Sequence, residues 1–87
     1  MSEVVDNAAR NRFELAVDGE IAILEYRITG DTIAFTHTET PEAMQGQGIA
    51  SRLVHDALTN AKARGLKIAP RCSFVVDYVA RHPEFKS

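Results

Sequence analysis

The segment Gln45-Gly46-Gln47-Gly48-Ile49-Ala50 lies where the chain changes from a strand-like to a helical pattern. Its two glycines allow a tight turn, because neither carries a Cβ. A glycine turn that leads into a helix directs free N–H groups and a partial positive charge at one point, where a phosphate or diphosphate can bind. No acidic side chain in residues 46–53 would repel an anion. The alternative is a loop whose glycines only satisfy turn geometry.

The residues before this segment have the period-two pattern of strands, with apolar and polar side chains in alternation. Asp18-Gly19 and Gly30-Asp31 are typical of tight turns between paired strands. Pro41 ends the pattern, because proline has no N–H to donate to a ladder. We therefore expect an antiparallel meander of three strands, over residues 13–17, 20–28 and 32–40.

The residues after the segment predict a helix, a short strand and a second helix. Apolar side chains recur at i, i+3 and i+4 through residues 49–61, and Gly65 suits a left-handed C-terminal cap. A fourth strand is expected over residues 66–72, then a helix with Ser73 as N-cap that ends near Pro83. A strand–helix–strand connection of this length favours parallel pairing of the third and fourth strands. The expected fold is α/β (α+β), a β-meander followed by β-α-β-α, with a mixed sheet and helices packed on it.

Length and composition narrow the class of protein. A chain of 87 residues is expected to form one domain with a core over roughly residues 4–85, and residues 1–11 are expected to be loose apart from Val4 and Val5. A net charge of −2 argues against electrostatic binding to nucleic acid. No apolar run is long enough to span a membrane, and the N-terminus does not resemble a signal peptide. The single cysteine excludes an internal disulfide and fits a reducing compartment, so we expect a cytoplasmic protein.

Three features are expected at one edge of the sheet. Ligands of open α/β sheets bind near the carboxyl ends of strands, where Thr40, the glycine turn and Cys72 would lie. Cys72 directly precedes the expected start of a helix, whose dipole favours a thiolate. Cys72 is therefore a candidate nucleophile, with a small buried hydrophobe as the alternative.

Period-two spacing places His37 and Glu39 on the same strand face as Ile33 and Phe35. Two apolar side chains followed by two polar ones indicate a core that gives way to a site or to solvent. A neutral His37 imidazole could take a proton from Cys72 or from an acceptor amine, provided that the groups are within hydrogen-bond reach. The alternative is a solvated strand end. We expect no metal site, because no group of side chains has convincing ligand spacing.

The spacing Gln45-x-x-Gly48-x-Ala50 is similar to the Gln/Arg-x-x-Gly-x-Gly/Ala signature of the GNAT acetyltransferase superfamily. Further segments resemble its small YjdJ-type branch, and the resemblance covers nearly the whole chain. These segments are Thr36-His37-Thr38-Glu39, Gly65-Leu66-Lys67-Ile68-Ala69-Pro70, Cys72 and Arg81-His82-Pro83-Glu84-Phe85. Larger members carry extra helices and strands that shape the acceptor pocket. The resemblance therefore supports binding of CoA better than it supports any particular acceptor.

The resemblance implies a minimal GNAT-like fold that binds acetyl-CoA and transfers the acetyl group to an amine. Main-chain amides of the turn would hold the pyrophosphate, and the strand before it would line the pantetheine arm. The implied cofactor-binding residues are Thr38, Thr40, Gln45, Gly46, Gln47, Gly48, Ile49, Ala50 and Ser51. Cys72 would act as nucleophile through a thioester or as a proton-transfer group, with His37 as base. Tyr78 is a further candidate, either to protonate the departing CoA thiolate or as a core residue.

Two interpretations from other classes stay open. A non-catalytic CoA-binding or adaptor module would keep the glycine turn and use Cys72 only for packing. A small RNA-binding domain is disfavoured by the net charge and by the lack of interleaved basic and aromatic residues on any strand. The expected partners are acetyl-CoA and an amine acceptor, without nucleic acid or membrane, and the expected state is a monomer or a weak homodimer.

Overall fold

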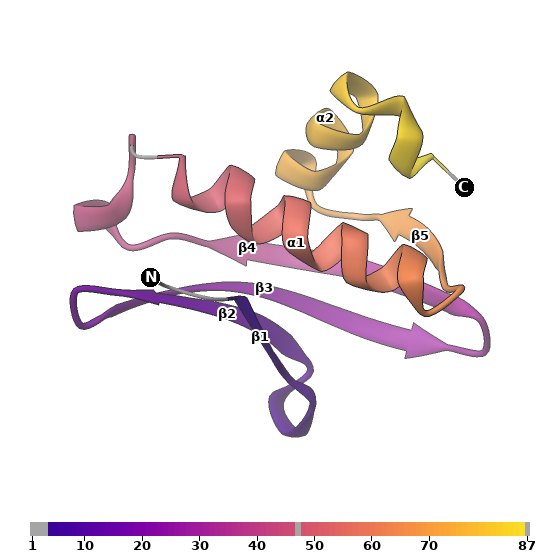
Figure 1. Cartoon of the computed structure of the whole chain (residues 1–87), viewed down its shortest axis with the longest axis horizontal. Helices are drawn as coiled ribbons and strands as arrows, with labels where there is room; N and C mark the ends of the chain where they lie inside the picture. Colours follow the sequence, from indigo (N-terminus) through magenta and orange to yellow (C-terminus); the bar gives the residue numbers. More distant parts are fainter. Residues whose placement is uncertain (1–3, 47, 87) are drawn as a thin grey trace.

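A computed structural model of the chain describes residues 4–46 and 48–86. Within these residues five strands form one sheet in the order β1-β2-β3-β4-β5, accompanied by two α-helices (Figure 1). The strands are β1 (Val4–Asn7), β2 (Arg12–Val17), β3 (Glu20–Thr29), β4 (Thr32–Glu39) and β5 (Lys67–Pro70). The helices are α1 (Ile49–Ala63) and α2 (Ser73–Arg81), with short 3-10 helices η1 (Ala8–Arg10), η2 (Glu42–Met44) and η3 (Pro83–Phe85).

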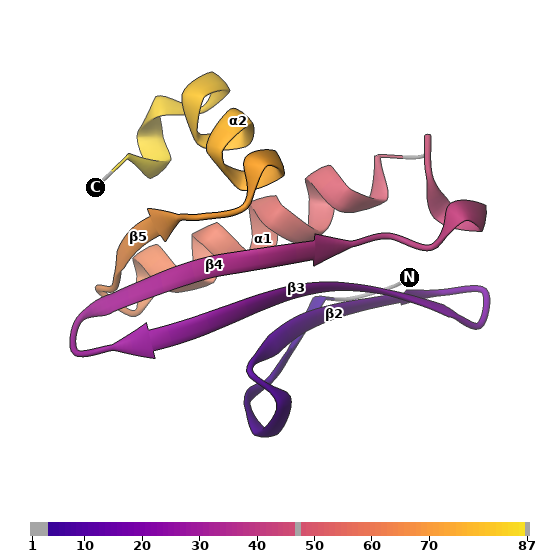
Figure 2. The same ribbon diagram turned by 180° about the vertical axis from the view of Figure 1, so that it is seen from behind.

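The sheet is mixed. Strands β1 to β4 pair antiparallel in sequence order, whereas β4 and β5 pair parallel because α1 carries the chain back along the sheet between them. Seen from behind, the sheet stands in front of α1, so this helix covers one face (Figure 2). α2 contacts β5, β4 and α1. The predicted α+β fold, with a meander, a parallel crossover and helices on a mixed sheet, is confirmed.

One hydrophobic core joins the inner face of the sheet to both helices. The rings of Phe13, Tyr26 and Phe35 cluster on the sheet side, with centroids 5.3 to 6.5 Å apart. The helices add a set of buried apolar side chains, namely Leu53, Val54, Ala57, Leu58, Ala61, Val75 and Val79. Burial of a Val, Leu or Phe side chain contributes about 1.5–3 kcal/mol. Packing of these apolar faces is therefore the main interaction that holds the helices on the sheet.

The expectation that residues 1–11 are loose apart from Val4 and Val5 is wrong for Asp6 and Asn7, which complete β1. This strand pairs with β2, and the Tyr26 hydroxyl on β3 donates a hydrogen bond of 2.6 Å to the Asp6 carboxylate on β1. Arg64 approaches the same carboxylate from beyond the end of α1, at 3.5 Å. The segment is short, with two apolar residues followed by two polar ones, so it has no alternation of its own. It is ordered by partners that are distant in the sequence.

Helix boundaries agree with the sequence to within a residue. Gly65, at φ 74°, follows α1, and the N–H groups of Gly65 and Leu66 bond to the carbonyls of Lys62 and Ala61. This pair of bonds is a Schellman motif, which needs a residue that tolerates positive φ. The N-cap of α2 is Cys72 rather than the expected Ser73, which is the first helical residue.

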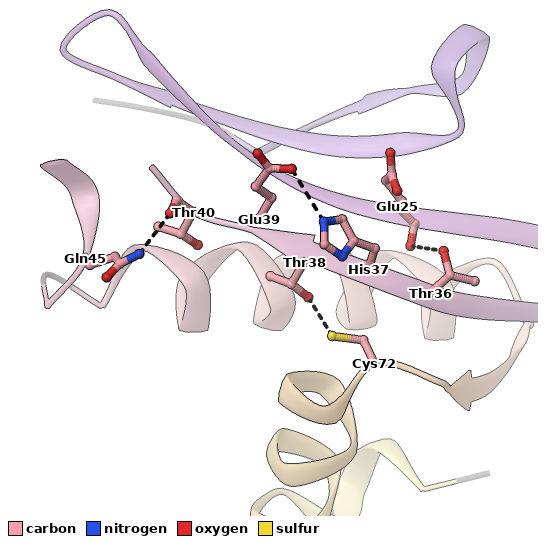
Figure 3. Close-up of polar contacts among 8 residues, drawn as sticks. All are labelled: Glu25, Thr36, His37, Thr38, Glu39, Thr40, Gln45 and Cys72. Atoms are coloured by element: carbon pink, nitrogen blue, oxygen red, sulfur yellow. Dashed lines mark hydrogen bonds and ion pairs between the residues drawn. The ribbon is translucent and has the colours of Figure 1, made fainter. Parts of the chain in front are cut away.

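A β-bulge interrupts β4 at Thr36. Tyr26 pairs with Phe35 and the preceding residue Glu25 pairs with His37, so Thr36 is an extra residue on β4. The Thr36 hydroxyl donates to the Glu25 carbonyl at 3.5 Å (Figure 3). An extra residue of this kind interrupts the alternation of side chains along the strand that carries it.

The bulge reverses the faces of the last residues of β4. Thr38 is half-buried toward the core, whereas the side chains of His37 and Glu39 are 54% and 69% exposed. The expectation that His37 and Glu39 share a face with Ile33 and Phe35 is therefore wrong. It assumed unbroken alternation, which the extra residue removes.

Replacing Tyr26 by Phe should lower the free energy of unfolding at pH 7 by about 1.5 kcal/mol. This is the lower end for a hydrogen bond to a charged group, because Asp6 is partly exposed. Urea denaturation of Tyr26→Phe measures the loss, and Tyr78→Phe controls for loss of a phenol elsewhere. An unchanged midpoint in Tyr26→Phe would show that the bond does not stabilise the fold.

The same bond predicts a response to alkali. Burial and the hydrogen bond to Asp6 raise the pKa of Tyr26 to about 12 from 10.0. Because the folded-state pKa is the higher one, this contribution is present below about pH 10 and is lost as the pH rises toward 12. Denaturation midpoints of the native chain should therefore fall more steeply between pH 10 and 12 than those of Tyr26→Phe.

Candidate active site

A cavity of about 490 Å³ lies between the end of β4, the start of α1 and the start of α2. Small-molecule and cofactor sites have volumes of about 300–1,000 Å³. The lining residues are Thr38, Thr40, Met44, Gln45, Gly46, Gly48, Ile49, Ala50, Ser51, Cys72, Ser73 and Phe74. Of the predicted site residues that the structure describes, all but His37 and the further candidate Tyr78 line this cavity, and Gln47 lies outside the described residues.

The cavity opens where β4 and β5 separate. Their last pair is Phe35 with Pro70, which has no N–H to extend a ladder. The N–H groups of Arg71 and Cys72 both donate to the Phe35 carbonyl, at 2.9 and 3.1 Å, and the chain then turns into α2. β4 continues to Glu39, so its final residues border the cavity on the side that β5 has left.

α1 begins at this cavity without a side-chain cap. Gly48 is the N-cap residue in the left-handed region, at φ 72°, and no described side chain caps the helix. The first intrahelical bond runs from the Arg52 N–H to the Gly48 carbonyl at 3.0 Å, so the N–H groups of Ile49, Ala50 and Ser51 precede the helical ladder. The first turn contains no acidic residue. This end of α1 can therefore bind an anion through main-chain N–H groups and the helix dipole.

The loop before α1 is held by side chains that sequence analysis assigned differently or missed. Gln45, expected as a cofactor contact, donates from Nε2 to the Thr40 carbonyl at 3.2 Å and so bridges the loop (Figure 3). Met44 was missed, although it is 3% exposed and anchors the loop in the core. Ser73 and Phe74 were also missed. Their position directly after Cys72 at a helix start was the available signal.

Cys72 has its sulfur directed at β4. The Cys72 Sγ and Thr38 Oγ1 are 3.3 Å apart, and Figure 3 shows the two side chains pointing toward one another. Burial raises the pKa of the thiol, but hydrogen bonding from Thr38 and the main-chain N–H groups of Phe74 and Val75 outweighs it, so the pKa is lowered overall. The Cys72 side chain makes no capping hydrogen bond to α2. The N–H groups of Phe74 and Val75 lower the pKa of the thiol because they favour its charged form. Cys72 thus combines a half-buried position with a stabilised thiolate.

His37 lies with Glu39 and not with Cys72. The His37 Nε2 and Glu39 Oε2 are 3.4 Å apart on the outer face, while the Cys72 sulfur meets Thr38 on the inner side of β4 (Figure 3). The structure therefore does not bring His37 and Cys72 together as a direct pair. The bulge explains the separation, because the extra residue Thr36 reverses the alternation and leaves His37 on the outer face and Thr38 on the inner face.

Tyr78 lies outside the cavity. Its hydroxyl is 3.1 Å from Nδ1 of His55 on α1, and its ring stacks on His82 with centroids 4.0 Å apart. Burial, with nearby carboxylates in addition, raises the pKa of Tyr78, so the phenol stays protonated at neutral pH. The structure does not bring this hydroxyl together with Cys72 around the cavity.

The fold and the cavity together define the class: an α+β domain in which a helix start without a side-chain cap lies beside two separating parallel strands. The chain belongs to the GCN5-related N-acetyl-transferase family, whose pattern matches residues 12–87. An acetyltransferase-like function follows from this membership. The finer resemblance to the small YjdJ-type branch stays a prediction.

This chain is similar to Protein NATD1 from several vertebrates. Protein NATD1 of Xenopus tropicalis is 32% identical over 77 residues, which are 85% of this chain and 71% of that protein. Protein NATD1 of Gallus gallus is 32% identical over 84 residues, or 93% and 76% of the two chains. Protein NATD1 of Homo sapiens is 34% identical over 77 residues, or 85% and 68%.

No helix within residues 4–46 and 48–86 is long and apolar enough to cross a lipid bilayer. Within the same residues, no three His, Cys, Asp or Glu side chains gather as they would around a metal ion.

Replacing Thr38 by Val should raise the pKa of the Cys72 thiol, because the hydrogen bond that favours the thiolate is lost. The rate of iodoacetamide alkylation against pH should then have its midpoint at higher pH, and alkylation at neutral pH should be several-fold slower. Thr38→Ser, which keeps the hydroxyl, is the matched control and should retain the native profile. Equal profiles for the Val and Ser variants would exclude this role of Thr38.

Proposed function

We propose that the chain binds acetyl-CoA in the cavity and transfers the acetyl group to an amine. One observation carries the proposal. The start of α1, whose N–H groups have no side-chain cap, and Cys72, whose thiol pKa is lowered, border the same cavity. Acetyl-CoA has a diphosphate and a thioester at separate points of one long molecule. A site for it needs an anion-binding end and a reactive end in one continuous space.

The diphosphate would bind at the start of α1. The main-chain N–H groups of residues 46–51 would donate to its oxygens, with Gln47 as a proposed contact whose geometry is not described. The pantetheine arm would follow β4 along Thr38 and Thr40, where no β5 strand lies beside them. Its amides can pair with main-chain groups of this strand, as an added strand does.

Cys72 would act at the thioester end. In a covalent route its sulfur attacks the thioester carbonyl carbon, the bond from that carbon to the CoA sulfur breaks, and the CoA thiolate takes up a proton. The acceptor amine then attacks the carbonyl carbon of the acetyl-cysteine, the bond from that carbon to the Cys72 sulfur breaks, and the proton lost by the amine passes to the released thiolate. In a direct route the amine attacks acetyl-CoA in a ternary complex, and Cys72 transfers a proton.

His37 is given no role in either route. Its imidazole is exposed beside Glu39 on the outer face of the sheet and does not line the cavity, so it is not placed to take a proton from an amine that attacks there. Either route requires a reduced Cys72, which is consistent with a cytoplasmic protein.

A non-catalytic CoA-binding or adaptor module is the second candidate. Its supporting observation is that Cys72 also packs against the hydrophobic core. In that case the cysteine would contribute to stability, and the cavity would hold CoA without chemistry.

Incubation with labelled acetyl-CoA should place one acetyl group on Cys72, and mass spectrometry of the peptide detects it. Cys72→Ala and Cys72→Ser should bind CoA as the native chain does but release no CoA thiol with a panel of amines. Turnover without acetyl on Cys72 would favour the direct route. Native turnover in both variants, or lost stability as their only defect, would favour the packing role.

Replacing Gly48 by Ala should weaken CoA binding by about fivefold or more, equivalent to roughly 1 kcal/mol. An added Cβ meets no atom within 4 Å, so the cost is backbone strain at φ +72°, which changes the aim of the N–H groups. Gly19→Ala, with φ +80° and equally open space in a distant hairpin, is the matched control. Calorimetric titration should show the loss only in Gly48→Ala, and equal affinities would contradict the assigned diphosphate position.

A further inference from the structure

The outer face of the sheet carries no α-helix of the described chain. Both helices belong to the one core on the inner face, and Figure 2 shows the sheet from the other side. Successive side chains of a strand point to opposite faces, so the outer residues are those that alternate with the buried ones. A sheet face in contact with water is usually polar. Here two large apolar side chains are exposed on it, Val5 at 56% and Ile21 at 47%.

Strand registers gather apolar side chains at one end of this face. Ile21 pairs with Ala16 near the hairpin that joins β2 and β3. The next row across the strands runs Val5, Glu14 and Ile23. Cross-strand neighbours on one face have Cβ atoms about 4.5–5.5 Å apart, so these side chains are in contact range. The outer patch is defined by the apolar members, which lie around Glu14: Val5, Ala16, Ile21 and Ile23.

The row beyond the outer patch is charged. Arg12 on β2 and Glu25 on β3 are register partners there. The Arg12 Nε pairs with the Glu14 carboxylate at 2.6 Å, whereas the Glu25 carboxylate forms no ion pair within the part of the chain that the structure describes. The outer face thus has an apolar end and, beside it, a cation and an anion at the same height on neighbouring strands.

We propose that this face binds a second copy of the chain, with a two-fold axis that runs parallel to β2 and β3 and between them. Such an axis places each row against the same row of the other copy and exchanges the two strands. The outer patches then meet, and Arg12 of each copy faces Glu25 of the other. A two-fold dimer needs a surface that is complementary to itself in this way. Two sheets with nearly aligned strands pack face to face in the same manner.

The two kinds of contact have different roles in this dimer. Contact between the outer patches removes apolar surface from water and supplies most of the binding free energy. The two reciprocal ion pairs select the orientation more than they add affinity. Arg12 can keep its bond to Glu14 through Nε while its other guanidinium N–H groups donate to a second carboxylate. No residue of the outer patch lines the cavity, so the dimer does not depend on the proposed function.

The size of the face sets the expected affinity. Strands lie about 4.8 Å apart and rise about 3.3 Å per residue, so the outer face of β1–β4 measures roughly 20 by 25 Å. A standard interface covers about 800 Å² per partner, which is more than this face offers. We therefore expect weak self-association, with a dissociation constant on the order of 0.1 mM.

Sedimentation equilibrium at protein concentrations below and above this constant measures the dimer. Ile21→Glu should weaken it about tenfold or more, because a charge would be buried between the outer patches. Val76→Glu is the matched control, since Val76 is 48% exposed on α2, away from the outer face, and should leave the dimer unchanged. Equal constants for the two variants, or a native chain that stays monomeric at millimolar concentration, would overturn the proposal.

Exchange of charges tests the axis. Arg12→Glu and Glu25→Arg should each weaken association of the variant with itself, because like charges then meet twice. An equimolar mixture of the two variants should form a heterodimer with about the native affinity, since opposite charges face one another at both places. Circular dichroism checks that each variant folds, and recovery in the mixture could not come from a folding defect. A mixture that associates no better than the separate variants would also overturn the proposal.

Discussion

The Phe35 carbonyl is the point on which the site depends. It accepts hydrogen bonds from two successive N–H groups, those of Arg71 and Cys72, where the parallel pair of β4 and β5 ends. Pro70 has no N–H with which to continue the ladder. After it, the two hydrogen bonds to the Phe35 carbonyl hold the chain where it turns into α2. The cavity, the position of the cysteine and the exposed end of β4 all follow from this separation of two strands.

Much of this architecture could be predicted from local chemistry. Tight turns, a proline that ends a strand and an apolar period of 3.6 residues each depend on neighbours in the sequence. The meander, α1 and its cap at Gly65 could therefore be predicted. β1 was not, because its order comes from Tyr26 and Arg64, which contact Asp6 from distant parts of the chain. Pairing imposed by the tertiary structure leaves no periodic signal in a strand of four residues, two apolar followed by two polar.

The candidate site divides in the same way. The glycine turn and Cys72 border one cavity, as expected from strand ends and a helix start that local pattern can place. The sequence could not show that His37 and Cys72 lie apart, because the extra residue Thr36 reverses the faces of the strand residues that follow it. The sequence around Thr36 contains no glycine or proline that would have indicated a bulge. Catalytic roles assigned by strand alternation therefore depend on the register of the neighbouring strand.

The uncapped start of α1 links folding to ligand affinity. A serine or aspartate at an N-cap satisfies helix N–H groups and typically contributes about 1 kcal/mol, whereas Gly48 offers no side-chain acceptor. An anion seated there would serve as the missing cap and complete the first helical turn. Without a ligand, α1 then lacks an N-terminal cap. With one bound, the free energy of unfolding rises with the logarithm of the ligand concentration.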